Sequence, residues 1–156
     1  MNKILKNKIM KTYFYKSLAK FKDVFPKEVL ENIEKIYRLE TANFKSEQYY
    51  NTYSAGMEAF SDKYPYGWTS IANNLWNIHQ EYAPVGIITM AENRTGKTKY
   101  FLKFKTPEAG IASLGTFLEI YKNNAGRWYS LTISGQAEYL EKLKKIEAKY
   151  VKELFS

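Results

Sequence analysis

Apolar residues recur every three or four positions over much of the chain, which is the spacing of helices that bury one face. Pro26 suits the first turn of such a helix, and Thr106 followed by Pro107 suits the start of another. The pattern predicts helices over residues 3–22, 26–40, 68–82, 107–123 and 136–154. We therefore expect a chain that is mainly helical.

Two shorter stretches predict strands. Residues 85–90 and 100–104 are rich in β-branched and aromatic residues, and the Asn-Arg-Thr-Gly sequence at 93–96 is typical of a hairpin turn. Residues 43–67 are rich in Tyr, Ser, Asn, Gly and Pro and predict a long irregular segment, which is often functional. The expected fold class is α+β, mainly α.

Cysteine and histidine usage excludes several chemistries. The chain has no Cys, and its one His, His79, lies in a predicted helix without a nucleophile-elbow motif. We therefore expect neither a metal or other cofactor nor a Ser-His-Asp triad. Residues 91–98 (AENRTGKT) are similar to a phosphate-binding loop, but strand-like sequence follows them where that loop needs the start of a helix.

Basic charge is concentrated at the start of the chain. Seven of the 24 Lys and Arg residues lie within residues 1–22, and none of the 16 Asp and Glu residues does. This distribution predicts a basic helical arm over residues 1–25 and a domain over residues 26–156. The arm either covers the core or docks on an anionic wall or membrane surface. Because the rest of the chain is nearly neutral, a nucleic-acid partner is not favoured.

Aromatic residues make up 17% of the chain, and 14 of them are Tyr. Most aromatic rings are core residues, but a surplus of Tyr also suits a surface that stacks on sugars. Tyr53, Tyr66, Trp68 and Trp128 are the candidates for such stacking, and the core is the alternative place for each.

Glu40 lies seven residues after Ile33 and four after Ile36, so it continues the apolar stripe of its predicted helix. A carboxyl group there is expected to point toward the interior or a cleft. Partial burial and the negative end of the helix dipole would both raise its pKa, as a general acid requires. The alternative is a helix that ends earlier and leaves Glu40 in solvent.

The Glu-Thr-Ala-Asn-Phe-Lys-Ser sequence at 40–46 resembles the Glu-Ser-Gly-Trp-Gly-Lys-Ser motif of bacterial endo-β-N-acetylglucosaminidases, in the lysozyme-like superfamily. Glu40, Lys45 and Ser46 match the motif, and Thr41 replaces its first Ser. Residues 100–109 resemble that family's Phe-Arg-x-Tyr-x-Ser-x-x-Glu entry into a helix, and residues 126–143 resemble its closing helix. The Asn-Asn-Ala-Gly sequence at 123–126 resembles the Tyr-Asn-Ala-Gly segment of lytic transglycosylases, a sister family. Together these resemblances cover about residues 29–152 in order.

The resemblance implies a lysozyme-like fold with a helical lobe, a small β-hairpin lobe and a glycan cleft between them. It also implies that Glu40 is the general acid. It also places Lys45 and Ser46 near the substrate. Tyr139 matches the second Tyr of the family's Gly-Tyr-Ala-Thr-Asp-Pro-x-Tyr motif. The first Tyr, which lines the family's active site, falls at Ile133, and Tyr129 is the nearby replacement.

The predicted function is cleavage of the β-1,4 glycosidic bonds of bacterial peptidoglycan. Glycosidases usually need a second carboxylate, for which Glu58 and Glu92 are candidates. A substrate-assisted enzyme or a transglycosylase needs Glu40 alone, and the sequence does not choose among these. The alternative function is a non-catalytic glycan-binding or virion structural protein of the same fold.

The sequence predicts neither a secretory signal nor a membrane span, because no apolar run is long enough for either. We therefore expect a protein made in the cytoplasm that acts on the cell wall, as in phage lysis or delivery by a virion.

Overall fold

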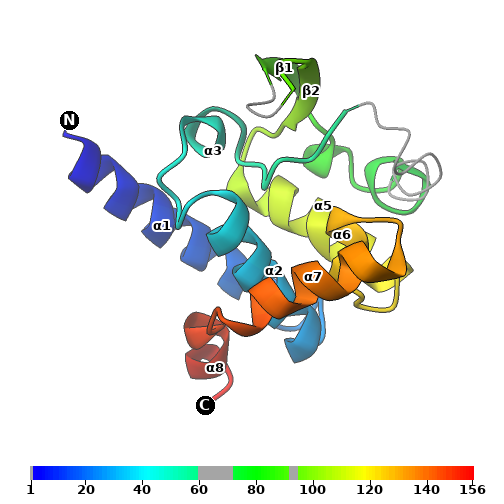
Figure 1. Cartoon of the computed structure of the whole chain (residues 1–156). Coiled ribbons are helices and arrows are strands. Elements are labelled where there is room, and N and C mark those ends of the chain that lie inside the picture. Colours follow the sequence, from blue (N-terminus) through cyan, green and yellow to red (C-terminus); the bar gives the residue numbers. More distant parts are fainter. Residues whose placement is uncertain (1, 60–71, 92–94) are drawn as a thin grey trace.

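The computed structural model describes residues 2–59, 72–91 and 95–156, and most of them lie in helices (Figure 1). Together with a two-stranded antiparallel sheet, these helices confirm the expected α+β, mainly α class. The elements are α1 (Lys3–Ala19), α2 (Lys27–Glu40), α3 (Glu47–Thr52), η1 (Ala72–Trp76), η2 (Gln80–Tyr82), β1 (Gly86–Ala91), β2 (Thr98–Lys103), α5 (Pro107–Ile120), α6 (Gly126–Tyr129), α7 (Ile133–Lys144) and α8 (Lys149–Leu154).

Helix α5 lies at the centre of the core. Thr106 caps its start as expected, because the Thr106 Oγ1 accepts a hydrogen bond from the backbone N–H of Ala109 at 3.3 Å. The helix buries ten of its 14 residues, which is typical of a helix surrounded by other elements. Gly115 permits a close contact between α5 and Phe25, since a Cβ there would lie 2.4 Å from the Phe25 ring.

Helix α2 buries the stripe that the sequence predicts. Its core residues are Val29, Leu30, Ile33, Ile36 and Tyr37. Figure 1 shows α7 crossing α2, and α8 packs against α2 as well. Helices α7 and α8 therefore both cover α2.

Helix α1 has a buried half and an exposed half. Phe14 and Leu18 are buried in the same core as α2 and α5. The first turns project from the body, and Ile4 is 83% exposed (Figure 1). Phe25 belongs to the same core.

The predicted hairpin is confirmed, with slightly different bounds. Strands β1 and β2 pair from Gly86 opposite Lys103 to Ala91 opposite Thr98. Residues 57–59 add to the other edge of β2, where Leu102 N donates a hydrogen bond to the Met57 carbonyl at 2.7 Å. The hairpin lies at the opposite end of the molecule from α8 (Figure 1).

Two of the predicted helices are not continuous in the structure. The helix predicted over 136–154 is divided into α7 and α8, because the chain turns between them and buries Ala148. Within the helix predicted over 68–82, the described residues form one π-turn, η1, and one 3₁₀ turn, η2. The Trp76 indole N–H donates to Ser113 Oγ at 3.1 Å, which fixes η1 against α5.

The segment expected to be irregular over 43–67 contains the short helix α3. Ser46 caps it by accepting a hydrogen bond from Tyr49 N at 3.3 Å. In the part of the chain that the structure describes, no helix is long and apolar enough to cross a membrane.

Candidate functional site

Three of the predicted site residues meet at the end of α2. The Tyr139 hydroxyl, on α7, donates a hydrogen bond to Glu40 Oε1 at 2.7 Å. The Tyr129 ring stacks on the Tyr139 ring with 5.2 Å between centroids and 11° between planes. Tyr139 is 2% exposed, whereas Glu40 and Tyr129 are exposed. We call these three residues the Glu40 cluster.

The expected burial of Glu40 is wrong. The apolar stripe of α2 ends at Tyr37, and the Glu40 side chain is exposed. The next residue, Thr41, takes the interior place, because its hydroxyl donates a hydrogen bond to the Tyr37 carbonyl and its side chain is buried. Glu40 therefore lies at the surface, oriented by Tyr139.

The chain makes a left-handed turn immediately after Glu40. The φ angles of Ala42, Asn43 and Phe44 are 49°, 56° and 67°. Thr41 stabilises the turn, since its Oγ1 accepts a hydrogen bond from Phe44 N at 2.8 Å. A left-handed backbone costs roughly 1–2 kcal/mol per residue other than Gly, and such strain is common at functional sites. The glucosaminidase motif has Gly at the positions of Ala42 and Phe44, where this backbone is left-handed.

Ala42→Gly should stabilise the protein by up to about 1 kcal/mol, because Gly adopts positive φ without strain and this gain exceeds its entropic cost. The melting temperature should rise by about 2–4 °C. The matched control is Ala137→Gly at an exposed position inside α7, which should lower stability by about 1 kcal/mol. Equal losses in the two variants would contradict the left-handed turn.

A surface pocket of about 450 Å³ opens beside this turn, within the usual size range of ligand sites. It lies between the end of α2 and the connection from α7 to α8. Its lining residues are Arg38, Leu39, Ala42, Asn43, Lys145, Ile146 and Glu147. The pocket lies next to the turn that follows Glu40, and Glu40 is not among its lining residues.

The other motif residues have separate places. Lys45 is exposed, and Ser46 is the cap of α3. Glu58 pairs with the hairpin, where its Oε1 lies 3.2 Å from Lys99 Nζ. Glu92, the other candidate for a second carboxylate, lies outside the described residues.

Of the candidates for sugar stacking, the structure describes Tyr53 and Trp128. Trp128 belongs to the core instead, since it is 8% exposed and its ring meets Phe117 edge to face. Tyr53 is half-buried, and burial raises the pKa of its hydroxyl. Tyr66 and Trp68 lie outside the residues that the structure describes.

Glu34 is a buried carboxylate of α2 that was not predicted from the sequence. This side chain is fully buried and accepts hydrogen bonds from the backbone N–H groups of Val151 at 2.9 Å and Tyr150 at 3.3 Å. Its Oε2 also lies 3.2 Å from the Arg38 guanidinium. Burial raises the pKa of Glu34. Its spacing of four residues from Leu30, on the apolar stripe, was the available signal.

Comparison of the chain with known proteins gives no matching family model, curated protein or solved structure. The described residues hold no group of three His, Cys, Asp or Glu side chains that could bind a metal. The function is therefore inferred from the geometry around Glu40 and from the motif resemblance.

Proposed function

We propose that the protein cleaves the β-1,4 glycosidic bonds of bacterial peptidoglycan on a lysozyme-like fold, with Glu40 as the general acid. The hydrogen bond between Glu40 and Tyr139 carries this proposal. The two residues are 99 positions apart and were selected by separate motif resemblances, yet their side chains are in contact. The left-handed turn over Ala42, Asn43 and Phe44, which includes the motif's two Gly positions, also supports it.

The geometry of the Glu40 cluster is compatible with general acid catalysis by Glu40. Protonated Glu40 donates its proton to the leaving glycosidic oxygen, which leaves a carboxylate on Glu40. The Tyr139 hydroxyl donates to this same group, so its hydrogen bond strengthens as negative charge develops in the transition state. Tyr129 holds the Tyr139 ring in place by stacking on it. Tyr139 is thus a positioning residue for the acid.

The test is incubation of purified peptidoglycan with the full chain, followed by mass spectrometry of the released products. Reducing ends at N-acetylglucosamine identify a glucosaminidase, and reducing ends at N-acetylmuramic acid identify a muramidase. Anhydro-sugars identify a transglycosylase. Intact glycan strands that still bind the protein would overturn the proposal and leave the non-catalytic glycan-binding function. The expected setting in phage lysis or a virion stays a prediction.

Tyr139→Phe should lower kcat about tenfold or more while leaving KM nearly unchanged, because it removes a hydrogen bond to a group that becomes charged in the transition state. The matched control is Tyr121→Phe, which removes a hydroxyl at a half-buried ring outside the Glu40 cluster. This control should keep the wild-type kcat. Wild-type kcat in Tyr139→Phe would show that Tyr139 does not assist the acid.

A further inference from the structure

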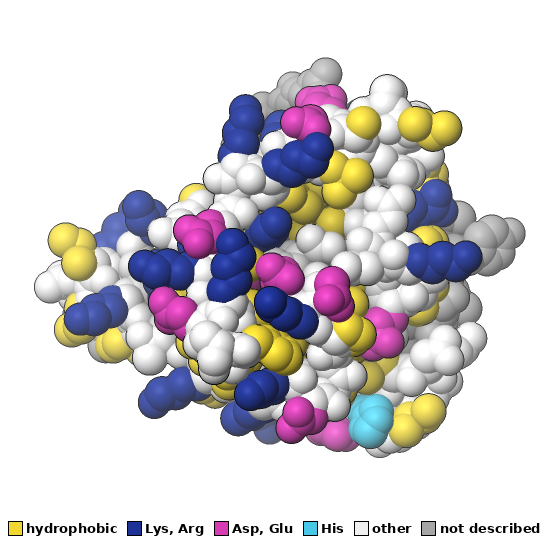
Figure 2. All heavy atoms as spheres, turned by 90° about the horizontal axis from the view of Figure 1, so that it is seen from below, with side chains coloured by type: hydrophobic (Ala, Val, Ile, Leu, Met, Phe, Trp, Pro, Cys, Tyr) yellow, Lys and Arg dark blue, Asp and Glu magenta, His cyan; other side chains and the backbone are white. Residues whose placement is uncertain are grey.

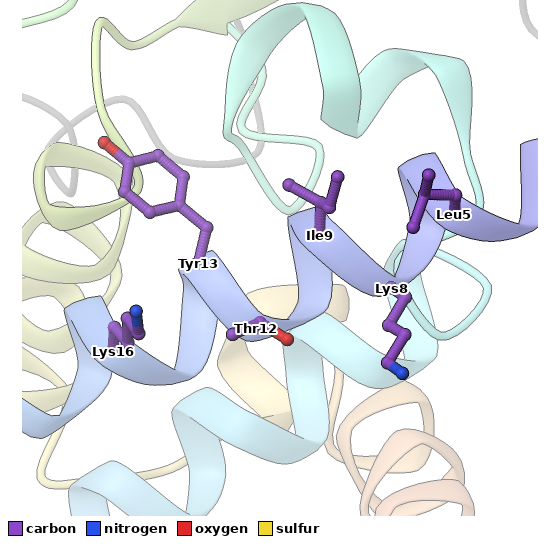
Figure 3. Close-up of a pocket in the computed structure, with 6 residues that line it drawn as sticks. All are labelled: Leu5, Lys8, Ile9, Thr12, Tyr13 and Lys16. Atoms are coloured by element: carbon purple, nitrogen blue, oxygen red, sulfur yellow. The ribbon is translucent and has the colours of Figure 1, made fainter. Parts of the chain in front are cut away.

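The N-terminal half of α1 has an exposed face that the Glu40 cluster does not use. Ile4, Leu5 and Ile9 are 83%, 47% and 45% exposed. A shallow pocket of about 380 Å³ follows this face. Its lining residues are Leu5, Lys8, Ile9, Thr12, Tyr13 and Lys16, all from the one helix (Figure 3).

The charge of this face has a single sign. Residues 1–22 include seven Lys and no acidic residue. Lys8 and Lys16 are exposed and line the pocket together with Leu5, Ile9 and Tyr13 (Figure 3). In Figure 2, Lys and hydrophobic side chains alternate over the end of the molecule where α1 projects.

The C-terminal half of α1 is fixed in the core, and a cation–π contact holds its N-terminal half. Phe14 and Leu18 are in the core, and the Lys6 ammonium lies 4.6 Å from the centroid of the Tyr50 ring. The helix therefore exists before any partner arrives, so binding does not require a coil-to-helix transition. A preformed helix loses less conformational entropy when it binds.

We propose that this face of α1 docks on an anionic lipid bilayer, with the helix lying along the surface. Exposed aliphatic side chains insert at the boundary between headgroups and acyl chains, while neighbouring lysines contact the acidic headgroups. An acidic wall polymer would complement the lysines alone and would leave Ile4, Leu5 and Ile9 in water. The combination of both side-chain types favours lipid. This inference is independent of the chemistry at Glu40.

The test is co-sedimentation of the full chain with vesicles of phosphatidylglycerol and phosphatidylcholine, compared with vesicles of phosphatidylcholine alone. Binding should require the acidic lipid and should weaken with added salt. Leu5→Ser/Ile9→Ser should lower the partition coefficient at least about tenfold. Each lysine removed in Lys8→Gln/Lys16→Gln should lower it about fivefold. All these residues are exposed, so the melting temperature should not change.

The matched controls make the same types of substitution at residues outside α1. Ile78→Ser/Ile133→Ser and Lys27→Gln/Lys149→Gln change exposed residues outside α1 and should keep wild-type binding. Dependence on the lysines but not on Leu5 and Ile9 would overturn the proposal in favour of an acidic polymer. A dimer in analytical ultracentrifugation that Leu5→Ser/Ile9→Ser dissociates would overturn it in favour of a second copy of the chain.

Discussion

Glu40→Gln should stop the release of sugar fragments from peptidoglycan while leaving the fold intact. The amide has the size of the carboxyl group and still accepts the Tyr139 hydrogen bond, but it has no carboxyl proton to donate. Loss of a general acid typically lowers the rate at least ~100-fold. Because Glu40 is exposed, the melting temperature should stay close to that of the wild type. Mass spectrometry of products and thermal unfolding measure the two quantities.

The matched control is Glu138→Gln, the same chemical change at an exposed residue next to Tyr139 in sequence. Its rate should equal that of the wild type. Full activity of Glu40→Gln would remove Glu40 from the mechanism and, with it, the proposed function.

Local rules explain the elements that could be predicted from the sequence. The apolar stripe of α2 depends on residues three and four apart, and the start of α5 depends on the adjacent Thr106 and Pro107. The hairpin is predicted by two β-rich runs and the turn between them. Each of these features depends on residues close together along the chain, so each can be predicted from the sequence pattern.

Long-range contacts explain what the sequence did not predict. The break between α7 and α8 coincides with the carboxylate of Glu34, which accepts hydrogen bonds from residues 116 and 117 positions away. Helical spacing contains no signal for such a contact. The left-handed turn was also missed, because Ala42 and Phe44 are not residues that favour positive φ.

Only part of the geometry of the candidate site could be predicted from the sequence, because that geometry also depends on long-range contacts. Periodicity placed Glu40 inside, but the helix ends there, and Thr41 enters the interior in its place. The motif resemblance selected both Glu40 and Tyr139 without giving their distance. Trp128 was a candidate for sugar stacking because exposure cannot be read from residue type, and its ring packs in the core.

Glu34→Ala should lower the free energy of unfolding by about 3–5 kcal/mol, the usual cost of removing one member of a buried ion pair. The substitution leaves the backbone N–H groups of Tyr150 and Val151 without the carboxylate and removes the charge opposite Arg38. Denaturant unfolding monitored by circular dichroism measures the loss. The control is Glu31→Ala at a less buried position of the same helix, which should cost less than 1 kcal/mol.

The loss should be concentrated at the C-terminal end of the chain. Glu34 joins α2 to the first turn of α8, so without it the amide protons of α8 should exchange faster than those of α5. Native-state hydrogen exchange resolves this difference. Equal acceleration in α5 and α8 would show that Glu34 supports the core as a whole rather than the docking of α8.

The pH dependence of the free energy of unfolding shows whether burial of Glu34 or the interactions of its charged form dominate its pKa. Burial raises the pKa of Glu34, so the folded state binds this proton more tightly than the unfolded chain does. The resulting stabilisation is complete below the unfolded pKa and is lost as pH rises through the folded pKa. Glu34→Gln has no such titration. The stability of the wild type relative to Glu34→Gln should therefore increase as pH is lowered from neutral. The opposite trend would mean that Arg38 and the two backbone N–H groups outweigh burial and hold the pKa below its ordinary value.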